Sequence, residues 1–339
     1  MPTGLGRWLP MTAVLVLALG PALAGADEAP PTFCHLAGST DPGTALQAEV
    51  QIGQEAIDGT LVRAGNDRPL ALAGTVLAGG PVELYVRGDF DQLVGTIRGT
   101  LRQEGPSGAW VVTGEWRDGD GLNPRPLALS EVARYVTLRA GQGDDLDVFC
   151  RYPFLLGTSP AIAEVNRRVR DEAMAWLQQA MSAGPWGASA PRAVRYEDTL
   201  VDDSHRLVSR LVRVVTASGT APPGVTYRSE NLEVVSGRVA PLRLGELFRA
   251  GSPYRQTLAT RALEELRRVV APDRVRGALA RLREDDLKNF TVSPAALQLV
   301  IPAARAGTLG PDDVLVSVPL GSVAGLLDPH GPLGPGLPH

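Results

Sequence analysis

The sequence is poor in several residue types that particular functions need. Only one of its 33 basic residues is a lysine, Lys288, and 37 acidic residues give the 339-residue chain a formal net charge of −4. The chain also lacks a run rich in lysine and arginine. A basic face is what attracts a phosphate backbone, so we predict no nucleic-acid partner.

Motifs that carry catalysis or hold cofactors are also missing. The chain has four histidines and two cysteines, and it lacks a Gly-x-Ser-x-Gly elbow, a P-loop and CxxC or HxxxH spacings. Nucleophilic catalysis, nucleotide binding and zinc binding rest on such patterns. His205 directly follows Asp203 and Ser204, but neighbours in one turn do not converge as a catalytic triad. We therefore predict no catalytic residue, no metal site and no cofactor, while a pair of acids brought together by folding stays open.

Only one stretch is long and continuously apolar. It runs over residues 11–24, after Arg7 and before the small-residue patterns Ala22-Leu23-Ala24 and Ala24-Gly25-Ala26. A membrane-spanning helix needs about 20 apolar residues, whereas a short apolar stretch before small residues is typical of a secretory signal peptide. We predict that residues 1–26 are a cleaved signal peptide. The mature protein is then secreted or periplasmic and has no membrane span.

The two cysteines, Cys34 and Cys150, fit export. Disulfides form in oxidising compartments, so the pair predicts one disulfide; the alternative is two buried free thiols. The bridge would close a loop of 116 residues. In the chain-entropy model such a loop stabilises the fold by up to ~4–5 kcal/mol.

Residues 34–149 are expected to be rich in β-structure. They consist of short apolar or alternating runs separated by breaks such as Gly79-Gly80 and Gly105-Pro106. Alternation with a period of two is typical of strands, and many short strands at even spacing indicate an antiparallel meander or small barrel. The expected strands are residues 46–52, 59–63, 70–77, 82–87, 92–103, 109–115 and 135–138.

The pattern changes after Cys150. Apolar residues recur at three- and four-residue steps after Ser159-Pro160 and again over 254–270, which predicts two amphipathic helices. The predicted fold class is therefore α+β, with a β-rich domain over 34–149, an α+β domain over 150–328 and a Pro/Gly tail over 329–339. The other expected elements are strands 192–200, 206–216, 225–235, 290–292, 297–301 and 314–319, a strand and helical turn over 241–248, and short helices 275–283 and 321–327.

Three short motifs of the first half follow one another in a familiar order. They are Gly99-Thr100-Leu101, Gly114-Glu115-Trp116 and Pro126-Leu127-Ala128-Leu129. They resemble a β-domain of bacterial envelope proteins in which a "G-x-l" strand precedes a "G-x-W" strand and a closing "pf-x-l" strand.

A longer set of motifs runs through the second half. In order, these motifs resemble those of the C-terminal domain of the anti-sigma factor RsiV. They are residues 150–153, 227–233, 236–238, 242–248, 290–293, 296–301 and 314–319. That domain also occurs in PdaC-type proteins, and the resemblance implies binding or sensing. The anti-sigma, transmembrane and deacetylase parts are absent. The family's "G-G-A-H" is replaced by residues 219–224, so any role of its histidine does not carry over.

Five residues are candidates for contacting a ligand. A proline-rich loop precedes an aromatic residue, and a tryptophan lies between glycines; the alternative is that all of them pack on their own domain. The candidates are Gly219, Pro222, Pro223, Tyr227 and Trp186.

Together these features predict an exported, non-catalytic binding or sensing protein of the cell envelope. The resemblance implies a lysozyme-like protein or a wall glycan as its ligand. Two alternatives stay open: an envelope hydrolase that cleaves peptidoglycan through an acidic pair, and a purely structural envelope protein. The sequence does not fix the oligomeric state.

Overall fold

A computed structural model gives the fold, and most of it is β-structure. Strands hold 57% of the described residues. Among the described residues, no helix is both long enough and apolar enough to cross a membrane. The predicted signal peptide and the predicted helix 275–283 lie outside the described residues. The structure describes residues 31–41, 43–66, 68–77, 80–142, 146–182, 192–203, 206–218, 223–235, 237–269, 287–302 and 313–333.

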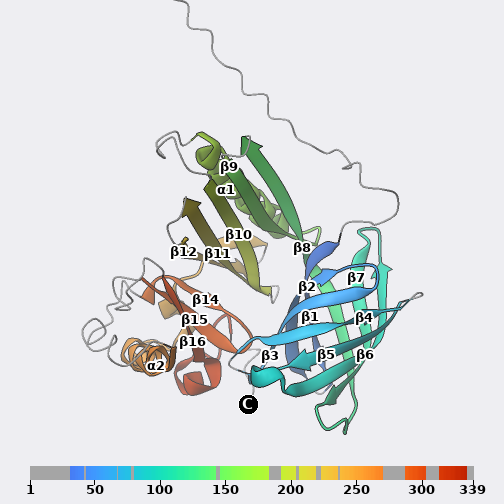
Figure 1. Cartoon of the computed structure of the whole chain (residues 1–339). Helices are drawn as coiled ribbons and strands as arrows, with labels where there is room; N and C mark the ends of the chain where they lie inside the picture. Colours follow the sequence, from blue (N-terminus) through green and yellow to red (C-terminus); the bar gives the residue numbers. More distant parts are fainter. Residues whose placement is uncertain are drawn as a thin grey trace, which may run out of the picture.

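The first eight strands form a closed antiparallel barrel (Figure 1). Each strand pairs with the next one along the chain, and β1 also pairs with β8, which closes the barrel. A short 3-10 turn, Asp89–Asp91, lies between β5 and β6. The strands are β1 (Thr32–Thr40), β2 (Thr44–Ile52), β3 (Ala56–Arg63), β4 (Leu70–Val76), β5 (Pro81–Arg87), β6 (Leu93–Glu104), β7 (Ala109–Asp118) and β8 (Arg125–Gln142).

Apolar side chains fill the barrel interior. Alternate residues of each strand point inward, as the period of two dictates, and they form one buried cluster. Trp116 is its largest member, and its indole nitrogen donates a hydrogen bond to Asp118 at 2.9 Å. The described part of the barrel interior is therefore a packed apolar core.

Strand β8 continues beyond the barrel and begins a second part of the same sheet. Its residues 133–142 pair with β9, and β10 lies parallel to β9. The α1 helix makes the crossover between β9 and β10, as a parallel connection requires. The elements are β9 (Leu146–Leu155), α1 (Pro160–Ser182), β10 (Arg192–Asp203), β11 (Leu207–Ser218), β12 (Gly224–Val235) and β13 (Arg238–Pro241).

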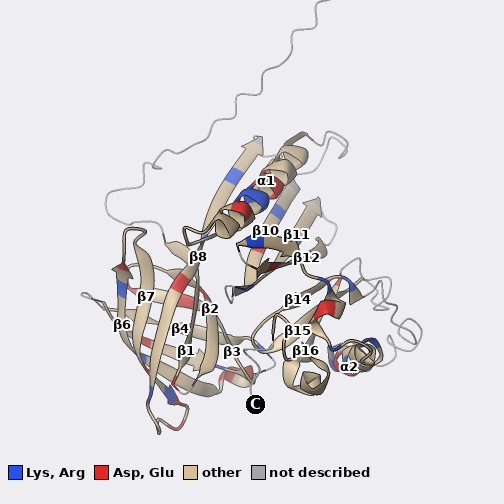
Figure 2. Cartoon of the chain, turned by 180° about the vertical axis from the view of Figure 1, so that it is seen from behind, with Lys and Arg blue, Asp and Glu red and all other residues tan. Residues whose placement is uncertain are grey.

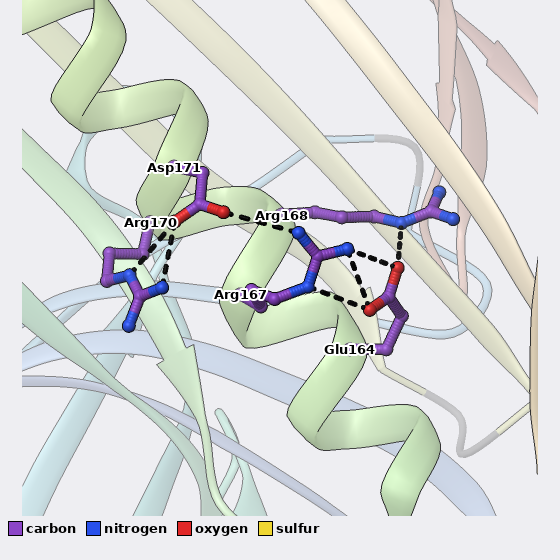
Figure 3. Close-up of polar contacts among 5 residues, drawn as sticks. All are labelled: Glu164, Arg167, Arg168, Arg170 and Asp171. Atoms are coloured by element: carbon purple, nitrogen blue, oxygen red, sulfur yellow. Dashed lines mark hydrogen bonds and ion pairs between the residues drawn. The ribbon is translucent and has the colours of Figure 1, made fainter.

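Helix α1 packs its apolar face on this sheet through Val165, Val169 and Ala173. Its outward face carries charged residues (Figure 2). Figure 3 shows Glu164 between two arginines, with Arg168 Nε donating to Glu164 Oε1 at 2.8 Å. Exposed pairs at these spacings stabilise a helix by only ~0.2–0.5 kcal/mol each. Pairing within the helix therefore explains the charged residues of this face without a ligand.

The opposite face of the same sheet is covered by a smaller layer. Asn231 of β12 donates to the carbonyl of Phe290 at 2.7 Å, and Ser209 of β11 accepts from the amide of Val292 at 2.8 Å. One apolar core lies beneath this layer. Its elements are η2 (Leu244–Leu247), α2 (Tyr254–Val269), β14 (Phe290–Val292), β15 (Ala296–Ile301), β16 (Val314–Pro319), η4 (Leu320–Ser322) and η5 (Ala324–Leu326).

The predicted α+β class with a separate second domain is wrong. One 13-stranded sheet runs from β1 to β13 without interruption, and the chain is mainly β. The boundary predicted between residues 149 and 150 falls inside β9. The physical reason is that β8 pairs with strands of both parts. The second part of the sheet is therefore a continuation of the barrel wall.

Candidate ligand-binding cleft

A cleft of about 280 Å³ lies where the barrel meets the second part of the sheet. Its barrel wall is the outer face of β1, β2 and β3, together with Pro69. Its other wall comes from β10, β11 and β12, with contributions from Ser293 and strands β15 and β16. The lining residues are His35, Gln47, Glu49, Thr60, Val62, Pro69, Glu197, Thr199, Leu200, Val201, Leu211, Arg213, Tyr227, Ser293, Gln298 and Leu315.

Strand register places three polar residues in a row on the barrel wall. His35 of β1 is directly opposite Glu49 of β2, and Glu49 is opposite Thr60 of β3. Cys34 and Leu36, the neighbours of His35, are members of the barrel core. His35 is therefore on the outer face, and its 3% exposure comes from the wall that covers it.

A second row crosses the facing wall. Glu197 of β10 pairs in register with Arg151 of β9 on one side and with Arg213 of β11 on the other, and Arg213 is opposite Tyr227 of β12. Tyr196 and Leu200, which alternate with these residues, belong to the core beneath α1. The alternation thus turns Glu197 and Thr199 toward the cleft, which they line.

Each carboxylate of the cleft has an arginine partner. Arg213 Nη1 donates to Glu197 Oε2 at 2.8 Å, and Arg151 Nη2 lies 3.4 Å from Glu49 Oε1. The Arg151 guanidinium also lies over the rings of Phe33 and Tyr135, at 5.5 Å and 5.3 Å from their centroids. The formal charges of these two pairs cancel.

Burial changes the titration of two cleft residues. It raises the pKa of Glu49, despite the opposing effect of Arg151, and the charge of Glu197 raises it further. Burial lowers the pKa of His35 to about 4, so its imidazole is neutral at pH 7. A neutral imidazole has one donor and one acceptor nitrogen. Within the described part of the chain, neither nitrogen of His35 has a hydrogen-bond partner.

The structure brings one of the five sequence candidates into this cleft. Tyr227 lines it, and its backbone is held by Asp313, which accepts from the amide at 3.2 Å, and by Asn289, which donates to the carbonyl at 3.0 Å. Pro223 is exposed and just precedes β12. Gly219, Pro222 and Trp186 lie outside the described residues, as does His205.

The disulfide expected between Cys34 and Cys150 is not formed, and both residues are buried free thiols. Cys34 is opposite Arg134 on one edge of β8, whereas Cys150 is opposite Leu138 on the other edge. Four residues of strand span about 13 Å, and a disulfide needs Cα atoms within ~7 Å. The register of β8 therefore keeps the two sulfurs apart.

A second hollow, of about 360 Å³, lies between η2, α2 and β14. Three exposed basic residues, Arg243, Arg255 and Lys288, line it together with apolar side chains. Among the described residues, no polar side-chain atom of its lining is buried without a partner. This hollow therefore lacks a buried group without a partner, such as His35 in the first cleft. We call that first cleft, between the barrel and the second part of the sheet, the junction cleft.

Arg210 is the centre of a buried ion cluster on the α1 side of the sheet. It is 1% exposed, donates to Glu230 from Nε at 2.7 Å and contacts Asp198 and Glu172. Its ion-pair partners are three carboxylates, so the buried positive charge is paired. No group of three or more acids, histidines or cysteines within the described ranges is arranged to hold a metal ion.

Comparison with known proteins gives only distant likenesses. No family model and no curated protein matches the chain. Crystal structures of two proteins assigned to the DUF3298 family match part of the chain. One, from Pseudomonas aeruginosa PAO1, is 14% identical with a TM-score of 0.42, and the match covers 57% of this chain and 94% of that one. Another, from Bacteroides fragilis NCTC 9343, is 11% identical with a TM-score of 0.36 and covers 58% and 94%.

Proposed function

We propose that this protein is an exported binding protein of the cell envelope that holds a fragment of wall glycan in the junction cleft. The observation that carries the proposal is the cleft itself, which has two facing rows of polar side chains from separate parts of the sheet. A concave site with a few convergent polar groups is the usual form of a small-molecule site. The predicted signal peptide supports the envelope location.

The size of the cleft favours a glycan over a folded protein as its occupant. Its volume is about 280 Å³, near the lower end of the range for small-molecule pockets. A stable protein–protein interface buries about 800 Å² on each partner, which this cleft does not offer. A lysozyme-like protein, the other ligand implied by the RsiV resemblance, would have to bind elsewhere, and it serves as the comparison ligand in the test.

The test is a binding measurement on the exported, mature chain. Purified peptidoglycan is sedimented with the protein, and a soluble muropeptide mixture and a c-type lysozyme are each titrated by calorimetry. Saturable binding of peptidoglycan and muropeptides without binding of lysozyme is the expected result. A dissociation constant of 100 µM corresponds to a binding free energy of ~5 kcal/mol in magnitude. If neither peptidoglycan nor muropeptides bind at 100 µM ligand, the proposal is wrong and the structural role remains.

One observation favours a second candidate, an envelope hydrolase. Glu49 and Glu197 line the same cleft from opposite walls, and burial raises the pKa of Glu49. Two carboxyl groups that face each other across a cleft are the arrangement that glycoside hydrolysis uses. To separate binding from hydrolysis, the protein is incubated with peptidoglycan, with and without EDTA. New reducing ends are then assayed. Release that is lost in both Glu49→Gln and Glu197→Gln would establish the hydrolase.

A further inference from the structure

We propose that Glu49 recognises a protonated primary amine, so that the wall fragment held in the junction cleft is one that carries a free ammonium group. This inference rests on the proposed function, because it assigns the ligand chemistry of the same cleft. Its starting observation is the accessibility of the Glu49 side chain, which lines the cleft and is 25% exposed.

Glu49 is the accessible charged acceptor of the barrel wall. The ring nitrogens of His35, its neighbour on β1, are both buried and out of reach of a ligand. In the part of the chain that the structure describes, the Glu49 carboxylate has one ion-pair partner, Arg151, whose Nη2 lies 3.4 Å from Oε1. An ordinary N–H···O hydrogen bond is about 2.7–3.2 Å long, and a carboxylate can accept about four. Most of the acceptor capacity of Glu49 is therefore unused.

The charged side chains that line the cleft leave it negative. Among the described residues these are two carboxylates, Glu49 and Glu197, and one guanidinium, that of Arg213, which gives a formal charge of −1. Arg213 Nη1 donates to Glu197 Oε2 at 2.8 Å, so this cation is directed to the facing wall. Arg151, the partner of Glu49, does not line the cleft. A ligand with one positive charge near Glu49 is therefore the electrostatic complement of the site.

The surroundings of Glu49 disfavour its ionised form. Burial raises the pKa of Glu49 by more than Arg151 lowers it, and the charge of Glu197 raises it further. An opposite charge within ~4–6 Å stabilises an ionised carboxylate. An ammonium group supplies that charge together with three N–H donors, whereas a hydroxyl supplies one donor and no charge. Hydrogen bonds between ionised groups are also roughly twice as strong as neutral ones.

Calorimetry at pH 6 with two matched pairs of probes tests this assignment, because a wall fragment can carry its amine on the sugar or on the peptide. Chitobiose has free amines, and N,N′-diacetylchitobiose is the same disaccharide with each amine acetylated. The peptide pair is a lysine-containing stem tripeptide with its side-chain amine free or acetylated. We expect wild type to bind the amine form of at least one pair at least ten times more tightly than the acetylated form. The pair that shows the difference identifies the source of the amine.

Glu49→Gln keeps the shape of the side chain and removes its charge. It should weaken binding of the preferred amine by roughly 10- to 100-fold and leave the acetylated partner within a few-fold of wild type. The matched control is Glu83→Gln, which makes the same replacement on β5 at a carboxylate that pairs with Arg98 outside the cleft. This control should change neither affinity.

Should Glu49→Gln fail to fold, ¹³C labelling of the glutamate carboxyl groups in the wild type gives the same information. Saturation with the preferred amine should lower the pKa of Glu49 and leave that of Glu83 unchanged. The acetylated partner should move neither. An unchanged Glu49 titration in the presence of the bound amine would overturn the assignment.

The outcomes separate this inference from the function on which it rests. If wild type binds muropeptides but distinguishes neither amine from its acetylated form, the cleft function stands and the role of Glu49 is wrong. Equal weakening by Glu49→Gln and Glu83→Gln would show a general effect of net charge and would also overturn that role. If wild type binds none of the probes and no muropeptide, the glycan-binding function itself is wrong, and this inference falls with it.

Discussion

Arg151 of β9 reaches across to Glu49 of β2, with Nη2 3.4 Å from Oε1, and so links the barrel to the sheet that grows out of it. Glu49 of this pair lines the cleft. Both side chains are largely buried, at 19% and 25% exposure. Removing one partner of such a pair leaves the other charge in a poorly solvated place.

We therefore expect Arg151→Met to lower the free energy of unfolding by about 1–3 kcal/mol. Urea denaturation followed by tryptophan fluorescence measures the change. Arg139→Met is the matched control, because Arg139 is exposed on β8 and lies over the ring of Phe149. Its effect should be within ~0.5 kcal/mol. Equal losses for the two variants would mean that the Glu49–Arg151 link contributes nothing specific.

His35 should make the protein sensitive to mild acid. Its pKa is about 4 in the folded chain, against an ordinary value near 6.5 when unfolded. Between these values the unfolded chain binds a proton that the folded chain does not, so stability falls as pH decreases. The contribution is fully present above about pH 6.5 and is lost as pH falls through about 4. It amounts to roughly 3 kcal/mol over that window.

Comparison of wild type with His35→Gln isolates this contribution. Both chains keep Glu49, whose raised pKa acts in the opposite direction, so its effect largely cancels in the difference. Urea denaturation at pH 7.5, 6, 5 and 4.5 should show wild type losing stability relative to His35→Gln at each step below 6.5. A difference that does not change with pH would show that the imidazole is not shielded from solvent.

Much of the architecture could be predicted from residue patterns alone. Strands β2 to β7 and β10 to β12 alternate clearly, and their positions were predicted to within a few residues. The helices α1 and α2 were predicted from their three- and four-residue steps. These elements are regular because each buries one face against a single core.

Two strands that the cleft depends on, β1 and β8, were not predicted in full. Strand β8 has a buried acid, Glu131, in its middle, which accepts from the amide of Trp110 at 2.9 Å and from Arg134. A charged residue inside an apolar run indicates the end of a strand. For that reason only pieces of β8 were predicted. Strand β1 was not predicted, and Cys34 within it was assigned only to a disulfide. The register that sets His35 opposite Glu49 depends on β1, so the site could not be found.

The two thiols should be present but unreactive in the native protein. Burial raises the pKa of Cys34 well above its ordinary range and that of Cys150 to about 12, so neither forms a thiolate at neutral pH. We expect Ellman's reagent to detect almost no thiol in the native protein and two per chain in guanidinium chloride. No thiol after denaturation without reductant would instead establish the disulfide, together with a different register at β8.

Arg210 should be among the most important residues for stability. It is enclosed by Asp198, Glu172 and Glu230, and its loss would leave Asp198 buried without a counter-charge. Arg210→Met should cost about 3–5 kcal/mol. Adding Asp198→Asn to the same chain should restore part of that loss. The control is Arg206→Met, whose side chain is 44% exposed and 3.8 Å from Glu233. Thermal unfolding by circular dichroism ranks the three variants.

Gly114 of β7 illustrates why a short sequence motif can have a purely structural cause. It is directly opposite Gly99 of β6, and a Cβ added to Gly114 would lie 2.1 Å from the carbonyl oxygen of Arg98 and 2.6 Å from the Cα of Gly99. Both atoms are backbone, so relief requires the two strands to separate. The glycines of the "G-x-l" and "G-x-W" motifs thus permit close approach of β6 and β7, beside the buried Trp116.

We expect Gly114→Ala to destabilise the protein by about 1–3 kcal/mol, because the strands must shift to admit the methyl group. Gly325→Ala is the control, since a Cβ there meets no atom within 4 Å, and alanine also restricts the unfolded chain. That variant should be neutral or slightly stabilising in the same urea titration. If the two substitutions had equal effects, the glycine pair would not be a packing requirement of the barrel. The motif would then need a functional explanation on the outer face of β6 and β7.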